Sequence, residues 1–321
     1  MLVKAQEDVS PDYGCIPEER SIEMYIKKGV IILDKPPGPT SHEVVSWVKK
    51  ILNLNRAGHG GTLDPRVTGV LPVLLESSTK AGDILLSDKK EYICLMKLHD
   101  SISPKEITEV CNQFVGKIYQ RPPLKSAVKR RLRIREIFYL DILEIDRKDV
   151  LIKVGCEAGT YIRKLVFDMG EVLGCGAHMS QLRRTMSGNF FEDEMLVTLQ
   201  DIKDAYTIFK ENGDETELRK IIIPLERVLK GLPRIIVKDS AIDAICHGAG
   251  LMAPGVLSLD ENVTSGKDTA IFTLKGEVVG VGDAKMDARQ IIKAESGVVV
   301  DTKKVFMQPG VYPKGWRSKT V

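Results

Sequence analysis

The feature that most constrains this chain is the run Gly-His-Gly-Gly-Thr-Leu-Asp-Pro at residues 58–65, in which Asp64 is the only acid. Glycine lets the backbone approach a ligand closely, and proline holds the residue before it in an extended or turn conformation. An apolar stretch follows at residues 70–73. The run therefore predicts one carboxylate presented from a tight turn that leads into a buried segment. The simpler alternative is an Asp-capped surface loop, since aspartate is a common turn residue.

Composition excludes several classes of protein. The 321 residues suggest about two domains, and 43% hydrophobic with 28% charged residues is ordinary for a soluble globular protein. A net charge of only +3 means that any nucleic-acid binding must come from local basic patches. The six cysteines form no Cys-x-x-Cys pair, which argues against structural zinc or disulfides and favours a reducing cytoplasm. No apolar run reaches the length of about 18 residues that suggests a membrane span, so we expect no membrane partner.

Helix and strand signals mix over the first 231 residues without a regular βαβ repeat. This favours an α+β domain with a mixed, largely antiparallel sheet. An apolar run at residues 29–35 predicts a buried strand, and Thr40 with Glu43 forms a capping box that starts a helix. Further predictions are a strand at 91–99, a helix at 103–116, a hairpin at 137–154, a helix at 160–173 and a short element at 181–186.

The two ends of the chain differ from this region. Residues 1–28 are polar and predict an extension outside the core. After a linker near residues 230–233, short apolar segments alternate with turns, which predicts a compact β-barrel. We expect its strands at 235–237, 256–259, 270–274, 278–281 and 298–300, and one helix at 241–246.

A basic run at residues 125–135 has six cations in eleven residues, after the rigid entry Arg-Pro-Pro. Charge of one sign at this density favours contact with a polyanion, although a solvated charged face is the simpler alternative. The cations that we take as candidate contacts to such a polyanion are Lys125, Lys129, Arg130 and Arg131.

Other candidate site residues are scattered along the chain. Tyr92, on a predicted strand, is by its position a candidate core tyrosine, since strands favour aromatic residues. Tyr161 and Arg163 stand at a predicted helix N-terminus, where phosphate or carboxylate is favoured. Arg184 belongs to an arginine pair that also suits a solvated surface. His59 is a candidate site residue, but a structural histidine in a polar loop is an equally good interpretation. The spacing of His59 from other potential ligands does not suggest a metal site.

The run that contains Asp64 resembles the catalytic loop of the TruB pseudouridine synthases. Its Gly-Gly-Thr-Leu-Asp-Pro form is similar to the dyskerin-type branch of the family, which works in H/ACA guide-RNA particles. The resemblance implies that Asp64 is the catalytic carboxylate and that Tyr92 stacks on the extruded uridine. It places Arg184 beside Asp64, where a bidentate contact would orient the carboxylate and hold it ionised. Tyr161 and Arg163 become pocket and RNA-backbone contacts.

The resemblance also implies a domain organisation. It divides the chain into an N-terminal extension (1–28), a catalytic domain (29–231), an RNA-binding PUA domain (232–310) and a tail (311–321). The basic run corresponds to a loop that closes over RNA, and it looks shorter here than in stand-alone bacterial relatives.

The implied activity is the isomerisation of uridine to pseudouridine in rRNA, with tRNA left open as a further substrate. An H/ACA guide RNA would select the target, and the small core proteins of the particle would be partners. The reaction moves a glycosidic bond within one nucleotide, so we expect no cofactor and no metal. A stand-alone tRNA pseudouridine-55 synthase and a non-catalytic RNA scaffold remain alternatives. The short loop disfavours the first, and the intact set of Asp64, Tyr92 and Arg184 disfavours the second.

Overall fold

The computed structural model describes residues 1–87, 89–122, 129, 131–192 and 195–314. The chain divides into two compact units. The central unit comprises residues Ile31–Leu74 and Ala81–Ile221, and the terminal unit comprises Met1–Val30, Leu75–Lys80 and Ile222–Val321. Among the described residues, no helix combines the length and the apolar character needed to cross a membrane.

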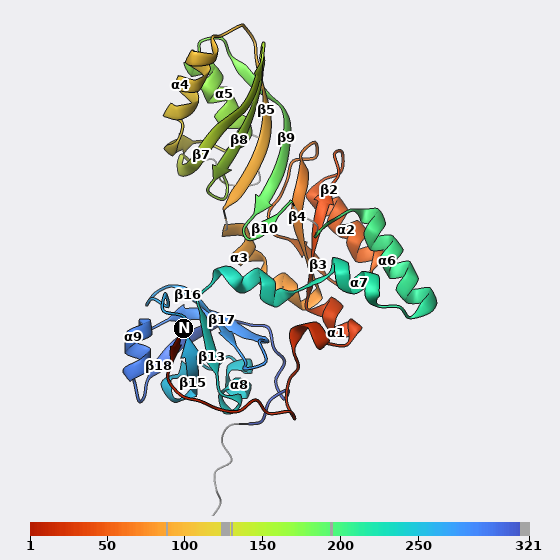
Figure 1. Cartoon of the computed structure of the whole chain (residues 1–321), viewed down its shortest axis with the longest axis vertical. Coiled ribbons are helices and arrows are strands. Elements are labelled where there is room, and N and C mark those ends of the chain that lie inside the picture. The colour runs from red at the N-terminus through yellow and green to blue at the C-terminus, as the bar shows by residue number, and fades with distance from the viewer. Residues whose placement is uncertain (88, 123–128, 130, 193–194, 315–321) are drawn as a thin grey trace, which may run out of the picture. The chain divides into compact units, whose positions relative to one another are not determined.

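The central unit is built on a mixed sheet with the strand order β11-β2-β4-β9-β5-β8-β7-β6 (Figure 1). Strand β11 pairs with β2, and β4 with β9, in parallel, whereas β9, β5, β8, β7 and β6 are successively antiparallel. This confirms the predicted α+β class with a largely antiparallel sheet. The strands are β2 (Gly29–Lys35), β4 (Thr68–Leu75), β5 (Lys90–Leu98), β6 (Gly116–Gln120), β7 (Arg133–Asp146), β8 (Asp149–Cys156), β9 (Ala177–Ser187) and β11 (Leu196–Val197).

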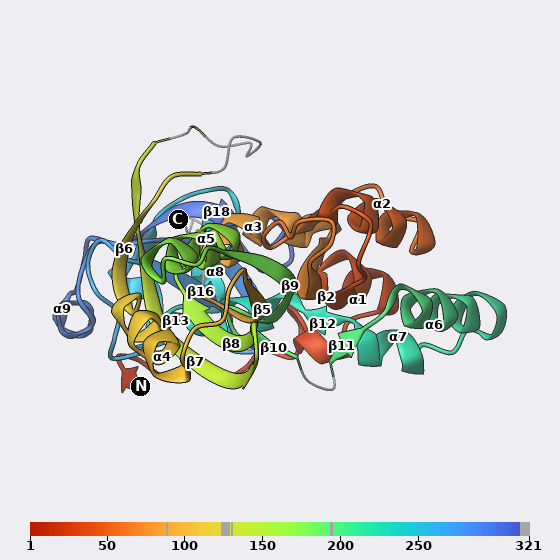
Figure 2. The same cartoon turned by 90° about the horizontal axis from the view of Figure 1, so that it is seen from above.

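Two of the predicted helices, at 103–116 and 160–173, are present as α4 and α5 and pack on this sheet. Both α4 and α5 lie against the antiparallel strands, α4 on β7 and α5 on β9 (Figure 1). Helix α6 packs against α2 and lies beside α7 (Figure 2). The predicted capping box of Thr40 and Glu43 is confirmed at the start of α2, and Ser103 with Glu106 forms another at α4. The helices are α2 (Ser41–Ile51), α4 (Pro104–Gln113), α5 (Ile162–Val172), α6 (Leu199–Asn212) and α7 (Thr216–Ile221).

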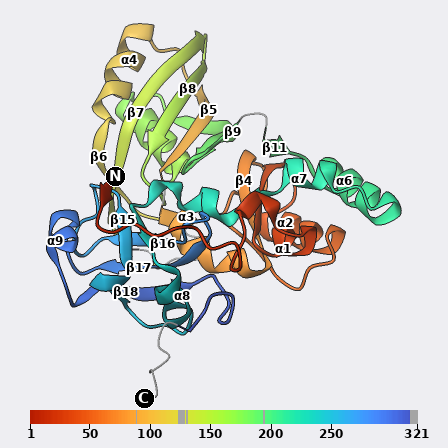
Figure 3. The same cartoon turned by 60° about the horizontal axis from the view of Figure 1, so that its bottom comes forward.

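The terminal unit holds a seven-stranded sheet in the order β1-β15-β13-β16-β17-β18-β14 (Figure 3). Each of the five predicted strands overlaps an observed one, and the predicted helix overlaps α8 (Asp239–Cys246). Buried aliphatic side chains such as Ile235, Ile271 and Val279 form the core of this unit. The strands are β1 (Leu2–Val3), β13 (Arg234–Val237), β14 (Leu251–Met252), β15 (Val256–Leu259), β16 (Asp268–Phe272), β17 (Val278–Ala284) and β18 (Val298–Val305).

The expectation that residues 1–28 lie outside the core is wrong. Strand β1 adds to β15, with Leu2 opposite Leu259. Three residues of helix α1 (Ile22–Lys27) are buried: Ile22, Tyr25 and Ile26. Few apolar residues lie in this polar segment, so the sequence gives no clear signal that they are buried. They become core residues only in the tertiary structure of the terminal unit.

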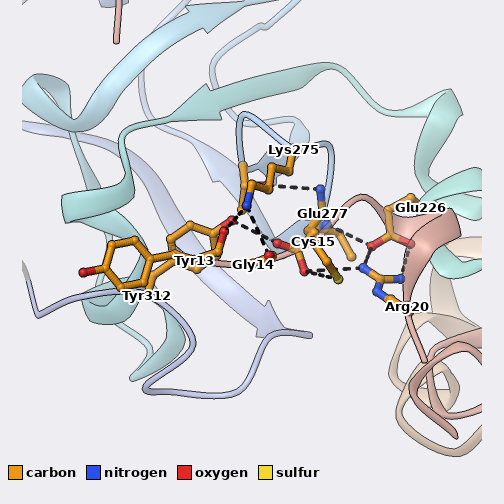
Figure 4. Close-up of polar contacts among 10 residues, drawn as sticks. Tyr13, Gly14, Cys15, Arg20, Glu226, Lys275, Glu277 and Tyr312 are labelled. Carbon is orange, nitrogen blue, oxygen red and sulfur yellow. Dashed lines mark hydrogen bonds and ion pairs between the residues drawn. The ribbon is translucent and has the colours of Figure 1, made fainter. Parts of the chain in front are cut away.

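A buried ion pair reinforces this attachment (Figure 4). The Arg20 guanidinium, whose side chain is 2% exposed, donates to both oxygens of Glu226 at 3.0 and 2.6 Å. Glu277 lies 3.9 Å from the same guanidinium and accepts a hydrogen bond from the Tyr312 hydroxyl at 2.9 Å. Buried charges are tolerated when they are paired, so Arg20 and the two acids hold one another in place. The N-terminal residues are therefore a structural part of the terminal unit.

Candidate active site

The run at residues 58–65 leads into a tight turn, and Asp64 is the first residue of that turn. The Asp64 carbonyl accepts a hydrogen bond from the Val67 N–H at 3.0 Å, which closes the turn around Pro65 and Arg66. The Asp64 side chain is 56% exposed. Strand β4 begins at Thr68 and is buried from its second residue onward. The predicted presentation of one carboxylate from a turn that leads into a buried segment is confirmed.

A fully buried lysine anchors this turn. The Lys35 ammonium, at the end of β2, donates to the carbonyls of Pro65 and Val67 at 2.9 and 3.0 Å. Burial lowers the pKa of Lys35 below its usual value, and the nearby negative charge of Asp64 opposes this shift. Lys35 therefore fixes the backbone on the C-terminal side of Asp64. Sequence reasoning missed this residue, although a lysine that ends an apolar strand is a usable signal.

Ser41 anchors the other side of Asp64. Its buried hydroxyl donates to the Leu63 carbonyl at 3.0 Å and accepts from the Leu63 N–H at 2.8 Å. Both main-chain groups of the residue before Asp64 are thereby satisfied. Sequence reasoning missed Ser41 as well, because the capping role of its neighbour Thr40 accounts for a polar pair at this place.

Arg163 forms an ion pair with the Asp64 carboxylate. Its guanidinium donates to the Asp64 carboxylate from the second residue of α5. Such a charge-assisted hydrogen bond is stronger than one between neutral groups, and it restricts the orientation of the carboxylate. The Arg163 side chain is 59% exposed, so solvent screens the pair and both partners remain open to a ligand.

The expected bidentate contact from Arg184 to Asp64 is wrong. Arg184 lies on β9, is 1% exposed, and donates to the carbonyls of Val70 at 2.7 Å and Gly61 at 3.2 Å. Burial lowers its pKa, and the interaction with Tyr92 opposes that effect. Arg184 therefore holds the glycine-rich run onto β4, whereas Arg163 holds the carboxylate.

Gly69 explains why Arg184 comes so close to this run. Residue 69 has φ +98, and a Cβ built there would lie 2.2 Å from the Arg184 carbonyl oxygen. The parallel pairing of β4 with β9 sets these two residues opposite each other. A side chain at this position would separate the strands, so glycine is required.

Tyr92 lies next to Arg184 in the pairing of β5 with β9 and is 9% exposed. Burial raises the pKa of Tyr92, so its hydroxyl stays protonated over the physiological range. Its position beside Arg184 joins two of the expected site residues. Stacking of Tyr92 on a uridine stays a prediction.

The remaining candidates lie near this centre in different ways. Tyr161 is half-buried and forms the N-cap of α5, two residues before Arg163. His59 is half-buried with its ring 4.9 Å from that of His42, and its Nδ1 atom has no hydrogen-bond partner among the described residues. Burial lowers the pKa of His59, helped by His42 and Arg184, and this favours the neutral imidazole. In the described part of the chain, no group of three or more His, Cys, Asp or Glu side chains is arranged to hold a metal ion.

Of the basic run, Lys125 and Arg130 lie outside the described residues. Lys129 and Arg131 are described, and both are exposed. The run connects β6 to β7, which pair antiparallel.

Comparisons with known sequences cover nearly the whole chain. The N-terminal domain of the TruB family pseudouridylate synthases matches residues 49–106 and 99–162, and the C-terminal domain of tRNA pseudouridylate synthase B matches 163–230. A PUA domain matches residues 233–306, and a DKCLD domain matches 1–45. A probable tRNA pseudouridine synthase B of Methanopyrus kandleri is 57% identical and covers 100% of this chain and 94% of its own length. Its counterpart in Methanothermobacter thermautotrophicus is 56% identical, over 96% of this chain and 95% of that protein.

Two solved structures agree with this chain over almost their full length. An H/ACA RNP bound to a substrate RNA contains a chain that is 50% identical, with a TM-score of 0.93 and coverage of 98% of this chain and 96% of that one. A Cbf5-Nop10-Gar1 complex gives 53% identity, a TM-score of 0.93 and coverage of 98% and 95%. The chain therefore belongs to the TruB family of pseudouridine synthases, which isomerise uridine to pseudouridine in RNA.

Proposed function

We propose that this protein is the catalytic subunit of an H/ACA ribonucleoprotein and isomerises uridines in rRNA that a guide RNA selects. The observation that carries the proposal is the exposed Asp64 carboxylate, which is paired with Arg163 on a turn that Lys35 and Ser41 anchor from below. The solved structures that match over nearly the full chain, an H/ACA RNP and a Cbf5-Nop10-Gar1 complex, support the guided particle.

In this proposal Asp64 supplies the reactive anion. The glycosidic bond from N1 to C1′ breaks, the uracil turns, and C5 bonds to C1′ while the proton at C5 is lost and N1 gains one. A carboxylate near the flipped nucleotide serves either as a nucleophile at C1′ or C6, or as a base at C2′. Arg163 keeps that carboxylate oriented until the nucleotide binds.

The other site residues are assigned to recognition. Tyr92 provides an aromatic surface for the extruded base, and Tyr161 and His59 line the same pocket. Arg184 supports the glycine-rich run through the carbonyls of that run and of β4. Four cations of the basic run contact RNA phosphates: Lys129 and Arg131, which are exposed, and Lys125 and Arg130, which lie outside the described residues.

The PUA domain anchors the guide RNA, and small core proteins of the kind named in the matching complexes are the protein partners. We place the particle in the cytoplasm. The proposed division is a catalytic domain at 29–231, a PUA domain at 232–310 and a tail at 311–321, and the PUA match at 233–306 supports the second of these segments. Residues 1–28 belong to the terminal unit. No cofactor and no metal enter the proposed reaction.

A tritium-release assay tests this function, because isomerisation frees the hydrogen at C5 of uridine. The full chain is assayed on labelled rRNA and tRNA transcripts, with and without an H/ACA guide RNA and the core proteins. We expect release from rRNA only when the guide and the partners are present. The names of the curated relatives favour tRNA as a second candidate substrate. Efficient release from tRNA without a guide would indicate a stand-alone tRNA pseudouridine synthase instead of a guided particle. The absence of release under every condition would indicate a non-catalytic RNA scaffold.

A further inference from the structure

A buried glutamine, Gln120, forms hydrogen bonds with the main chain of Tyr161, two residues before Arg163. Gln120 is the last residue of β6 and is 1% exposed. Its side-chain Nε2 donates to the Tyr161 carbonyl at 3.2 Å, and its Oε1 accepts from the Tyr161 N–H at 2.9 Å. One amide thus satisfies both main-chain groups of a residue 41 positions away in the sequence, as a neighbouring strand would.

Tyr161 is the point at which α5 begins. It has extended backbone angles, φ −97 and ψ 98, and its side chain makes no capping hydrogen bond. Its carbonyl also accepts from the N–H groups three and four positions further on, which starts the helix. The amide of Gln120 therefore sets where the first turn of α5 lies. Arg163 is in that turn, so a shift of the Tyr161 backbone displaces the guanidinium that pairs with Asp64.

Gln120 is also the last residue of the strand that precedes the basic run in the chain. It pairs with Arg133 of β7, the strand that follows the first residues of the basic run in the chain. A residue that served only to seat the basic run would affect how tightly RNA binds. A residue that sets α5 would affect the rate at which bound RNA reacts. The two roles therefore separate in a measurement of affinity against rate.

We propose that Gln120 is a positioning residue for the catalytic ion pair: its amide fixes the Tyr161 backbone and thereby the Arg163 guanidinium opposite Asp64. The inference rests on the active site proposed above. It assigns a role in the reaction to a buried side chain that touches neither the catalytic carboxylate nor its arginine partner.

The first test compares Gln120→Met with the matched Gln113→Met, at an exposed glutamine that ends α4. Both variants are made in the full chain and assembled with an H/ACA guide RNA and the core proteins. Single-turnover tritium release is measured with all RNA bound, and RNA affinity is measured separately. We expect Gln120→Met to lower the rate about ten- to hundredfold, the range for losing hydrogen bonds to buried main-chain groups, with affinity unchanged. Weaker RNA binding with an unchanged bound-state rate would overturn the proposal.

The second test uses Gln120→Glu, which keeps the shape of the side chain and makes its donor titratable. A protonated carboxyl donates once and accepts once, as the amide does, whereas the ionised form only accepts. We expect a single-turnover rate near that of the parent at low pH and a decline as the buried carboxyl ionises with rising pH. The parent and Gln113→Glu should lack this decline. A variant rate that is independent of pH would contradict the proposal, and this test decides if Gln120→Met fails to fold.

A double-mutant cycle separates this inference from the site assignment. Arg163→Ala alone reports on the ion pair, and a parent-like rate for this variant would remove the pair from the proposed mechanism. If Arg163→Ala is slow, adding Gln120→Met should lower the rate little further, because both changes remove one interaction. If the two losses multiply, Gln120 acts independently of Arg163. That outcome would refute the positioning role of Gln120 and leave the assignment of the Asp64–Arg163 site unaffected.

Discussion

The guanidinium of Arg163 donates to the carboxylate of Asp64 from a residue 99 positions further along the chain. Both side chains are more than half exposed, while the backbone beneath Asp64 is held by buried groups. The site thus combines a rigid support with an accessible charged pair. The carboxylate is therefore accessible to a ligand without any opening of the fold.

Replacing Asp64 by Asn should abolish isomerisation and leave guide-RNA binding nearly unchanged, because a neutral amide serves neither as nucleophile nor as base. Tritium release at saturating RNA measures this. Asp141→Asn, an exposed position on β7 with the same loss of charge, is the control and should retain the parent rate. Residual activity of Asp64→Asn within about tenfold of the parent, roughly 1.4 kcal/mol in the barrier, would remove Asp64 from the chemistry.

The two arginines should respond differently to replacement by lysine. Arg163→Lys keeps the charge but loses the planar fork, so we expect a single-turnover rate lower by about tenfold, with little change in stability. Arg184→Lys loses donors to buried carbonyls, so we expect the free energy of unfolding to fall by about 1–3 kcal/mol as well. Urea unfolding and single-turnover kinetics on both variants measure this. Unchanged stability of Arg184→Lys with a reduced rate would mean that Arg184 acts on the carboxylate.

Arg20→Met should destabilise the terminal unit by about 3–5 kcal/mol, because it removes the guanidinium that pairs with the buried carboxylates of Glu226 and Glu277. Thermal and urea unfolding measure the effect. Arg289→Met, at an exposed position on α9 (Ala288–Lys293), is the matched control and should change little. The double variant Arg20→Met/Glu226→Gln should recover part of the loss, and equal losses in the single and double variants would argue against the ion pair.

His59 should make stability depend on pH. Its pKa is lowered in the folded protein, so the unfolded chain binds the proton more tightly. The free energy of unfolding should therefore fall as the pH drops below the usual histidine value of 6.5, and this loss should end below the lowered folded pKa. Urea unfolding between pH 7 and pH 5 should show a weaker dependence in His59→Gln. The exposed His247→Gln is the control, and identical pH profiles for the parent and His59→Gln would contradict the prediction.

Local structure followed closely from short sequence signals. The capping box of Thr40 with Glu43 and the apolar run of β2 each lie within a few residues, and both appear where they were expected. The β7–β8 hairpin turns at Arg147, which has φ +55, between strands of the predicted pattern. Such signals are reliable because propensity, capping and turn geometry act between near neighbours in the chain.

The partners of distant charged side chains were not predictable in this way. From the sequence we expect Arg184, of the pair at 183–184, beside Asp64 and Arg163 in contact with the RNA backbone, whereas the structure pairs Arg163 with Asp64. Which one reaches the carboxylate depends on the register of β4 with β9, where Gly69 brings the strands together and buries Arg184 against carbonyls. The same holds for Gln120, whose polar side chain has no visible partner until β6 and α5 are placed together.

The sequence by itself determined the family, the α+β class, the presentation of the Asp64 carboxylate from its glycine-rich turn and most of the secondary structure. Only the tertiary structure decided that Arg163 pairs with Asp64 and that the polar N-terminal residues belong to the terminal unit through Arg20. The physical reason is the range of the interactions. Turns and caps are set by neighbouring residues, whereas ion pairs and buried amides depend on strand registers and packed surfaces that join segments far apart in the chain.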